Sequence, residues 1–141
     1  MRRILPSVAF FVGGIAVAVS SIASGDYAVG AAFSLVAVAA GVLLSPLPFP
    51  RAVTTTDWQA AAEAGEVVVL HRPGCPYCLR LRFALGGVAD RATWADIWAD
   101  EAAAARVREA TGGDETVPTV LVDGEAHVNP DPEWVRGVLE P

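Results

Sequence analysis

Apolar residues are distributed very unevenly along this chain. From Ile4 to Phe49 the only charged side chain is Asp26, and apolar residues fill Leu5 to Ala23 and Tyr27 to Leu47. A helix rises ~1.5 Å per residue, so ~20 apolar residues cross the ~30 Å hydrocarbon layer of a membrane. Because such runs are too long for strands and too apolar for surface helices, the pattern predicts two transmembrane helices joined by a short loop.

The charges beside these runs predict their orientation. Arg2 and Arg3 precede the first run and Arg51 follows the second, whereas the connecting loop contains Asp26 and no Arg. Because positive residues favour the cytoplasmic side, we expect both ends of the pair, and the segment after it, in the cytoplasm. An alternative stays open, because residues 21–23 resemble the end of a signal peptide. If the chain had only one transmembrane helix, the segment after it would lie outside the cytoplasm.

Three alternating prolines separate the apolar half from the rest of the chain. Pro46, Pro48 and Pro50 cannot continue a helix and favour a stiff, extended linker. We therefore assign residues 1–50 to a transmembrane hairpin with its linker. Residues 51–141 form a second domain, which is long enough for one modest core.

The second domain alternates between helix and strand patterns. A capping box at Thr56 to Gln59 and the turn signal Asp123-Gly124 mark two element boundaries. Helices are predicted over 56–64, 75–85, 100–111 and from Asp131 onward, and strands over 67–70, 92–97, 118–122 and 125–128. This order of helices and strands predicts an α/β domain.

Composition narrows the classes of function. The chain has 10 basic and 16 acidic residues, a formal net charge of −6 and a hydrophobic fraction of 53%. Such a chain is too apolar to be disordered, and its two cysteines are too few for a disulfide-stapled miniprotein. An acidic domain is repelled by phosphate, so a nucleic-acid partner is not expected.

The two cysteines are candidates for redox chemistry. Cys75 and Cys78 flank Pro76-Tyr77 directly after an apolar strand, at the start of a predicted helix. A helix N-terminus offers unpaired N–H groups to Cys75, and Cys78 lies one turn later on the same face. This arrangement indicates a redox dithiol in which Cys75 is the nucleophile and Cys78 resolves the mixed disulfide.

Activation of Cys75 needs more than the helix terminus. Lowering the thiol pKa by ~2 units requires ~2.7 kcal/mol, whereas a helix N-terminus typically supplies ~0.3–1 kcal/mol. The charge of Arg72 and a hydrogen bond from the Cys78 thiol are the candidates for supplying the remaining stabilisation of the thiolate. His71 is a further candidate, although a histidine at a strand end is more often simply solvated.

Other interpretations of the two cysteines stay open. Half of a zinc site would need both His71 and His127 to converge on them. A structural disulfide would close only a short loop. Inert core thiols are disfavoured because Pro76-Tyr77 at a helix start should place the Cys75 sulfur at the surface.

Thr116-Val117-Pro118 begins a predicted strand and permits two interpretations. The proline is either an ordinary residue at a strand start or edge, or a cis proline packed against the dithiol. In the second case the Val117 backbone would be free to pair with a substrate peptide. Three tryptophans are expected to be packing residues: Trp94, Trp98 and Trp134.

Residues 66–141 resemble a glutaredoxin-type protein of the thioredoxin fold, in particular the mycoredoxin-like branch of actinobacteria. The joint spacing of the cysteine motif, Thr116-Val117-Pro118 and the turn at Asp123-Gly124 carries this resemblance. It implies a four-stranded mixed sheet flanked by helices, a cis bond before Pro118, and reduction of mixed disulfides between proteins and a small thiol. It also implies a thiol groove lined by Arg72, Tyr77, Thr116 and Val117, together with Pro118.

One segment departs from the family pattern. Glutaredoxins that hold glutathione usually have Gly-Gly and a nearby Asp after the fourth strand, where this chain has residues 128–132, Val-Asn-Pro-Asp-Pro. The departure is compatible with mycothiol as the thiol co-substrate instead of glutathione. We expect no bound cofactor or metal, and we expect S-thiolated or disulfide-containing proteins and the membrane as partners. The alternatives are outward-facing disulfide exchange and a non-enzymatic or metal-carrying domain.

Overall fold

The computed structural model describes residues 5–25 and 27–140. Its described residues separate into two compact units, and the boundary lies between Pro48 and Phe49. Arg2, Arg3 and Asp26, on which the predicted orientation depended, lie outside the described residues.

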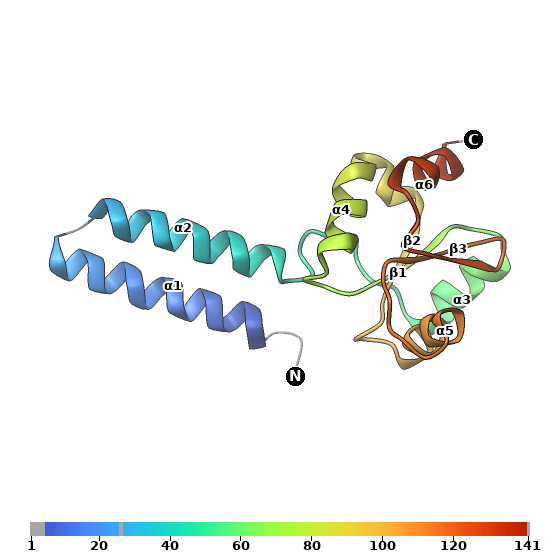
Figure 1. The fold of residues 1–141 in the computed structure, drawn as a ribbon, viewed down its shortest axis with the longest axis horizontal. Coiled ribbons are helices and arrows are strands. Elements are labelled where there is room, and N and C mark those ends of the chain that lie inside the picture. Colours follow the sequence, from blue (N-terminus) through green and yellow to red (C-terminus); the bar gives the residue numbers. More distant parts are fainter. Residues whose placement is uncertain (1–4, 26, 141) are drawn as a thin grey trace. The chain divides into compact units, whose positions relative to one another are not determined.

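The first unit is a pair of helices, α1 (Leu5–Ser24) and α2 (Tyr27–Leu43), which run antiparallel and side by side (Figure 1). Small residues allow this close approach. A Cβ built on Gly30 would lie 2.3 Å from the Cβ of Ser21, and one on Gly41 would lie 3.0 Å from the ring of Phe11. A larger side chain at either glycine would therefore push the helices apart.

The predicted membrane spans are not found. Among the described residues, no helix combines the length and the apolar character that crossing a membrane requires. The second run breaks early because the Ser45 hydroxyl donates to the carbonyl of Val42 (2.7 Å) and accepts from the Leu47 N–H (3.1 Å). Helix α2 thus has 17 residues and a length of ~25 Å, below the ~30 Å required. The prediction of an integral membrane protein with a cytoplasmic redox domain was wrong.

The second unit is built on a four-stranded sheet in the order β2-β1-β3-β4. Strand β1 (Val68–His71) pairs in parallel with β2 (Thr93–Asp96) and antiparallel with β3 (Thr119–Val122), which pairs with β4 (Glu125–Val128). All four residues of β1 are buried, as its continuous apolar sequence predicts for a central strand. The predicted mixed sheet is therefore confirmed.

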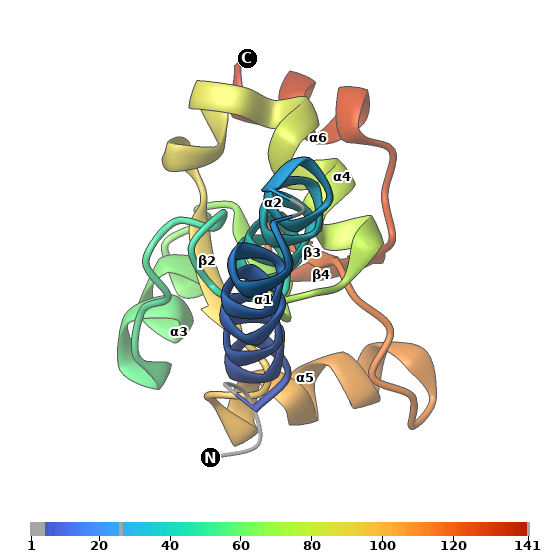
Figure 2. The same ribbon diagram turned by 90° about the vertical axis from the view of Figure 1, so that its left-hand side faces the viewer.

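Helices cover both faces of this sheet. Helices α4 (Pro76–Leu85) and α6 (Pro132–Leu139) lie on one face, and α3 (Thr55–Glu63) and α5 (Glu101–Thr111) on the other (Figures 1 and 2). A 3-10 helix that the sequence did not predict, η1 (Gly86–Arg91), connects α4 to β2. It is fixed to the sheet by the Trp94 indole N–H, which donates to the carbonyl of Ala89 at 2.8 Å.

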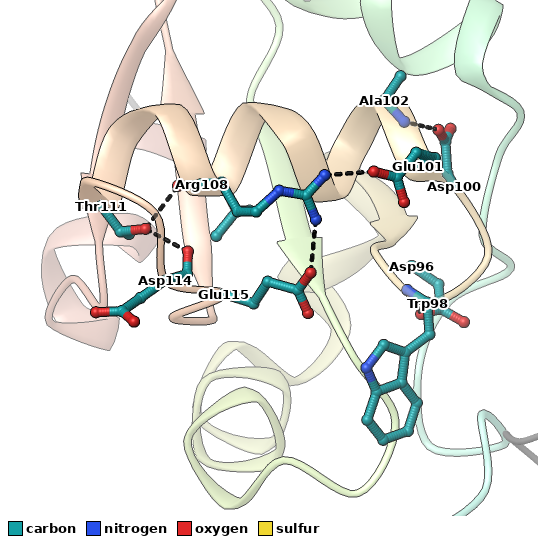
Figure 3. Close-up of polar contacts among 10 residues, drawn as sticks. Asp96, Trp98, Asp100, Glu101, Ala102, Arg108, Thr111, Asp114 and Glu115 are labelled. Atoms are coloured by element: carbon teal, nitrogen blue, oxygen red, sulfur yellow. Dashed lines mark hydrogen bonds and ion pairs between the residues drawn. The ribbon is translucent and has the colours of Figure 1, made fainter.

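Helix caps connect α3 with α5. The cap of α3 is Thr54, two residues before the predicted one, because its N–H and its hydroxyl both donate to the Asp57 carboxylate. Asp100 caps α5 through the N–H groups of residues 102 and 103, and it also accepts from the Thr55 hydroxyl (2.7 Å) and the Trp58 indole (2.8 Å). Figure 3 shows this end of α5 together with the ion pairs of Arg108. The Asp100 carboxylate thus joins two helices on the same face of the sheet.

Candidate active site

The dithiol lies where β1 leads into α4. Cys75 is the N-cap residue of α4, and Pro76 follows in the first turn, where a missing N–H has no cost. Gly74 precedes them with φ of 74°, a conformation that suits glycine. The start of the helix directs the backbone N–H groups of Tyr77 and Cys78 at the Cys75 sulfur.

The surroundings of Cys75 stabilise its thiolate. The hydrogen bond from the Cys78 side chain is the main cause that lowers the pKa of Cys75 to about 5, and burial opposes it. The two backbone N–H groups and the positive charge of Arg72 lower this pKa further. Conversely, the hydrogen bond to Cys75 and burial raise the pKa of Cys78. Arg72 and the Cys78 thiol, the two groups that the sequence predicted to lower the pKa of Cys75, therefore both do so, and the Cys78 thiol has the larger effect.

Cys75 is less exposed than the sequence suggested. Only 5% of its surface is accessible, because the side chain turns inward and Sγ lies 3.4 Å from the carbonyl oxygen of Val117, to which the neutral thiol donates. Pro76 and Tyr77 provide the exposed surface at this point. The lowered pKa, and not exposure, is thus what distinguishes Cys75 from an inert core thiol.

The Val117–Pro118 peptide bond is cis, which agrees with the second of the two interpretations of this proline. The same Val117 carbonyl receives the Cys75 thiol, so this segment lies directly beside the dithiol. Thr116, the preceding residue, is exposed, and its carbonyl accepts a hydrogen bond from the Thr119 hydroxyl at 2.8 Å.

The residues predicted to line a thiol groove differ in their surroundings. Tyr77 is 56% exposed and lines a hollow of about 170 Å³ with Arg80 of α4 and residues 129–132 at the start of α6. Arg72 and Val117 instead act on the sulfur atoms themselves. The sequence had identified residues 128–132 as unusual, but the contribution of Arg80 depends on how α4 packs beside α6.

His71 is buried, contrary to the expectation of a solvated residue. It is 1% exposed, and its ring stacks on Phe49 (centroids 4.4 Å apart) and meets Trp94 edge-on at 5.3 Å. Neither ring nitrogen has a hydrogen-bond partner among the described residues, and burial lowers the pKa of His71 to about 4. His71 is not among the groups that shift the pKa of Cys75, so it does not tune the nucleophile.

The tryptophans differ in their surroundings. Trp94 is a packing residue, as predicted, with 1% of its surface exposed. Trp134 is 41% exposed and packs on the ring of His127, and Trp98 is 44% exposed beside the Arg72 guanidinium. The contact of Trp98 with Arg72 was missed, because it depends on strand pairing and has no signal in the local sequence.

The histidines offer no support for a zinc site. His71 lies between Phe49 and Trp94, and His127 lies against Trp134. Within residues 5–25 and 27–140, no group of three or more His, Cys, Asp or Glu side chains is arranged to hold a metal ion. Both cysteines are free thiols, so the structure represents the reduced state of the pair.

The region that contains this site is similar to known proteins. The family model described as Glutaredoxin matches residues 67–128, which contain both cysteines and Pro118. Two proteins from strains of Mycobacterium tuberculosis, each named "Putative glutaredoxin", are 43% identical over 68 residues, or 46% of this chain and 79% of each relative. No solved structure gives a significant match. The thioredoxin-like sheet, the dithiol at the start of α4 and these relatives together show that the chain belongs to the glutaredoxin family.

Proposed function

We propose that this protein reduces mixed disulfides between proteins and a low-molecular-weight thiol, with Cys75 as the nucleophile. The observation that supports the proposal most strongly is the lowered pKa of Cys75, about 5, in a free dithiol at a helix N-terminus. A thiol with this pKa is almost entirely thiolate at neutral pH, whereas an ordinary cysteine is only ~3% thiolate.

In the first step the Cys75 thiolate attacks one sulfur of a protein–S–S–R disulfide. A bond forms between Cys75 Sγ and the sulfur of the small thiol R, and the S–S bond of the substrate breaks. The protein sulfur leaves as a thiolate and takes up a proton from solvent. The attacking thiolate exchanges its contact with the Cys78 thiol for the new covalent bond.

In the second step Cys78 loses its proton to solvent and its thiolate attacks Cys75 Sγ. The small thiol leaves as its thiolate and takes up a proton, and a Cys75–Cys78 disulfide remains. Before capture, the Cys75 side chain raises the pKa of Cys78 both by its hydrogen bond and by its charge. Both effects end when Cys75 carries the mixed disulfide, because the sulfur is then neutral. The Arg72 charge, which lowers the pKa of Cys78, continues to act. Cys78 therefore becomes a better nucleophile only when it is needed.

We propose mycothiol rather than glutathione as the small thiol, and we place its non-sulfur part in the hollow beside Tyr77. Arg80, Asn129 and Asp131 give this hollow a polar lining suited to sugar hydroxyl groups. Asp131 Oδ1 already accepts the Glu133 N–H at 2.8 Å as the cap of α6, which fixes the carboxylate at the rim. Pro130 and Pro132 restrict the backbone on either side of it.

The experiment compares release of mycothiol and of glutathione from the same S-thiolated protein, using the full chain and its Cys75→Ser and Cys78→Ser variants. Each reaction contains the corresponding free thiol, whose thiolate attacks the mixed disulfide on Cys75 when Cys78 is absent. We expect faster release of mycothiol, no release by Cys75→Ser, and continued monothiol turnover by Cys78→Ser without an intramolecular disulfide. Equal activity of Cys75→Ser and the unaltered chain would reject the catalytic assignment and favour a binding module. Faster release of glutathione would reject only the choice of thiol.

A further inference from the structure

Trp98 presents a large aromatic surface beside the Arg72 guanidinium. It follows β2, and Figure 3 shows its indole extending away from the ion pairs of α5. Although tryptophan is among the most apolar side chains, 44% of its surface is exposed. Packing in the core therefore does not account for a residue of this size at this position.

The backbone around Trp98 is held firmly. The Ile97 N–H donates to the His71 carbonyl at 2.9 Å, which extends the parallel pairing of β1 and β2 by one step beyond the His71–Asp96 pair. The Trp98 N–H donates to Asp96 Oδ1 at 2.8 Å, and the Ala99 N–H donates to the Asp96 carbonyl, also at 2.8 Å. Continued by one step, this register places Arg72 opposite Ile97, and Trp98 is the next residue along the chain.

The residue after His71 is Arg72, and its guanidinium carbon lies 5.7 Å from the centroid of the Trp98 ring. This separation is within the range of a cation–π contact, and arginine is the cation most often found over tryptophan. An arginine side chain without such a contact samples many rotamers, which spreads its charge over a larger volume.

We propose that Trp98 is a positioning residue that holds the Arg72 guanidinium beside the dithiol. Trp98 acts through Arg72 and need not touch the sulfur atoms. The inference rests on the proposed role of Cys75 as nucleophile, because it concerns the charge that stabilises this thiolate. Arg72 also acts on Cys78, so its position affects both steps of the exchange.

The test measures the rate of Cys75 alkylation by iodoacetamide against pH in the reduced full chain, with the modified peptide quantified by mass spectrometry. Loss of an exposed cation–π contact changes an equilibrium by about 2–5-fold. We therefore expect Trp98→Ala to raise the midpoint of the profile by at most ~0.3–0.7 pH units, and by no more than Arg72→Gln raises it. Trp98→Phe should restore most of the difference, because a phenyl ring can still face the guanidinium. The matched control is Trp134→Ala, which removes a similarly exposed tryptophan and should leave the midpoint unchanged.

Arg72→Gln completes a double-mutant cycle. If Trp98 acts through Arg72, Trp98→Ala should cause no further shift once the guanidinium is absent. An unchanged midpoint in Trp98→Ala, or an equal shift with and without Arg72, would overturn the inference while leaving Cys75 as the nucleophile. A midpoint near 8.5 in the unaltered chain would instead overturn the proposed activation of Cys75, and this inference with it.

Discussion

His71 should make the stability of the glutaredoxin-like unit strongly dependent on pH in mildly acidic solution. Its ring is buried between Phe49 and Trp94 without a hydrogen-bond partner among the described residues, so the fold accommodates only the neutral form. Burial lowers the pKa of His71 from 6.5 to about 4. Between these two values the unfolded chain binds a proton that the folded chain does not, and protonation therefore favours unfolding.

The size of this effect follows from the two pKa values. The His71 contribution to stability is fully present above pH ~6.5 and is lost as the pH falls toward the folded-state value. At ~1.4 kcal/mol per unit, the loss is about 2 kcal/mol by pH ~5 and about 3 kcal/mol by pH ~4. A loss of this size is a large fraction of the stability of a small domain.

The assay compares the unaltered chain with His71→Leu by denaturant unfolding at several pH values between ~7.5 and ~4. All 4 tryptophans lie in the second unit, so tryptophan fluorescence reports on its unfolding alone. Leucine keeps an apolar side chain of similar size in the stack and cannot be protonated. The difference in unfolding free energy between the two proteins should therefore change by about 3 kcal/mol across this range, with the unaltered chain losing more.

A control variant separates His71 from the other groups that titrate in this range. His127→Leu removes the second histidine and leaves the buried ring in place, so it should follow the unaltered chain. If His71→Leu and the unaltered chain lost stability in parallel, the argument from burial would be refuted, because no proton uptake could then be assigned to this ring.

Two further predictions concern Cys78 and Asp100. Cys78→Ala should raise the pKa of Cys75 well above 5, because the largest stabilising hydrogen bond is lost. Alkylation of Cys75 against pH measures this change. Cys78→Ser keeps a hydrogen-bond donor and should raise the pKa of Cys75 less. Asp100→Ala should lower the free energy of unfolding by ~2–3 kcal/mol, because it removes the cap of α5 and leaves the buried Trp58 indole without its acceptor. Asp100→Asn keeps a hydrogen-bond acceptor, so its free energy of unfolding should fall less. Equal losses of stability in the two variants would show that these hydrogen bonds contribute little.

Local patterns were sufficient to predict most of the second unit. The continuous apolar run before the dithiol predicted a buried central strand, and β1 is one. The turn signal at Asp123-Gly124 predicted a hairpin, and both residues have positive φ there, 50° and 81°. These elements could be predicted because the sequence around each of them determines its backbone conformation.

Features that depend on distant partners could not be predicted in this way. The burial of His71 depends on Phe49, which lies outside the strand pattern, and the contact of Trp98 with Arg72 depends on the register of β1 and β2. For the second predicted membrane span the reason was different. The prediction counted apolar residues up to Leu47, whereas the Ser45 hydroxyl and the prolines after it end helix α2 at Leu43.

The hydrogen bonds of the Asp100 carboxylate have a consequence for where the domain can be divided. The family match begins at residue 67, after Thr55 and Trp58, which supply two of the four donors to this carboxylate. A fragment cut to the matched segment would leave the Asp100 carboxylate without two of its four hydrogen-bond donors. It would also leave a cavity where the Trp58 indole packs. Any shortened version intended for crystallisation or solution spectroscopy should therefore begin at Phe49, so that it keeps α3 and the segment before it.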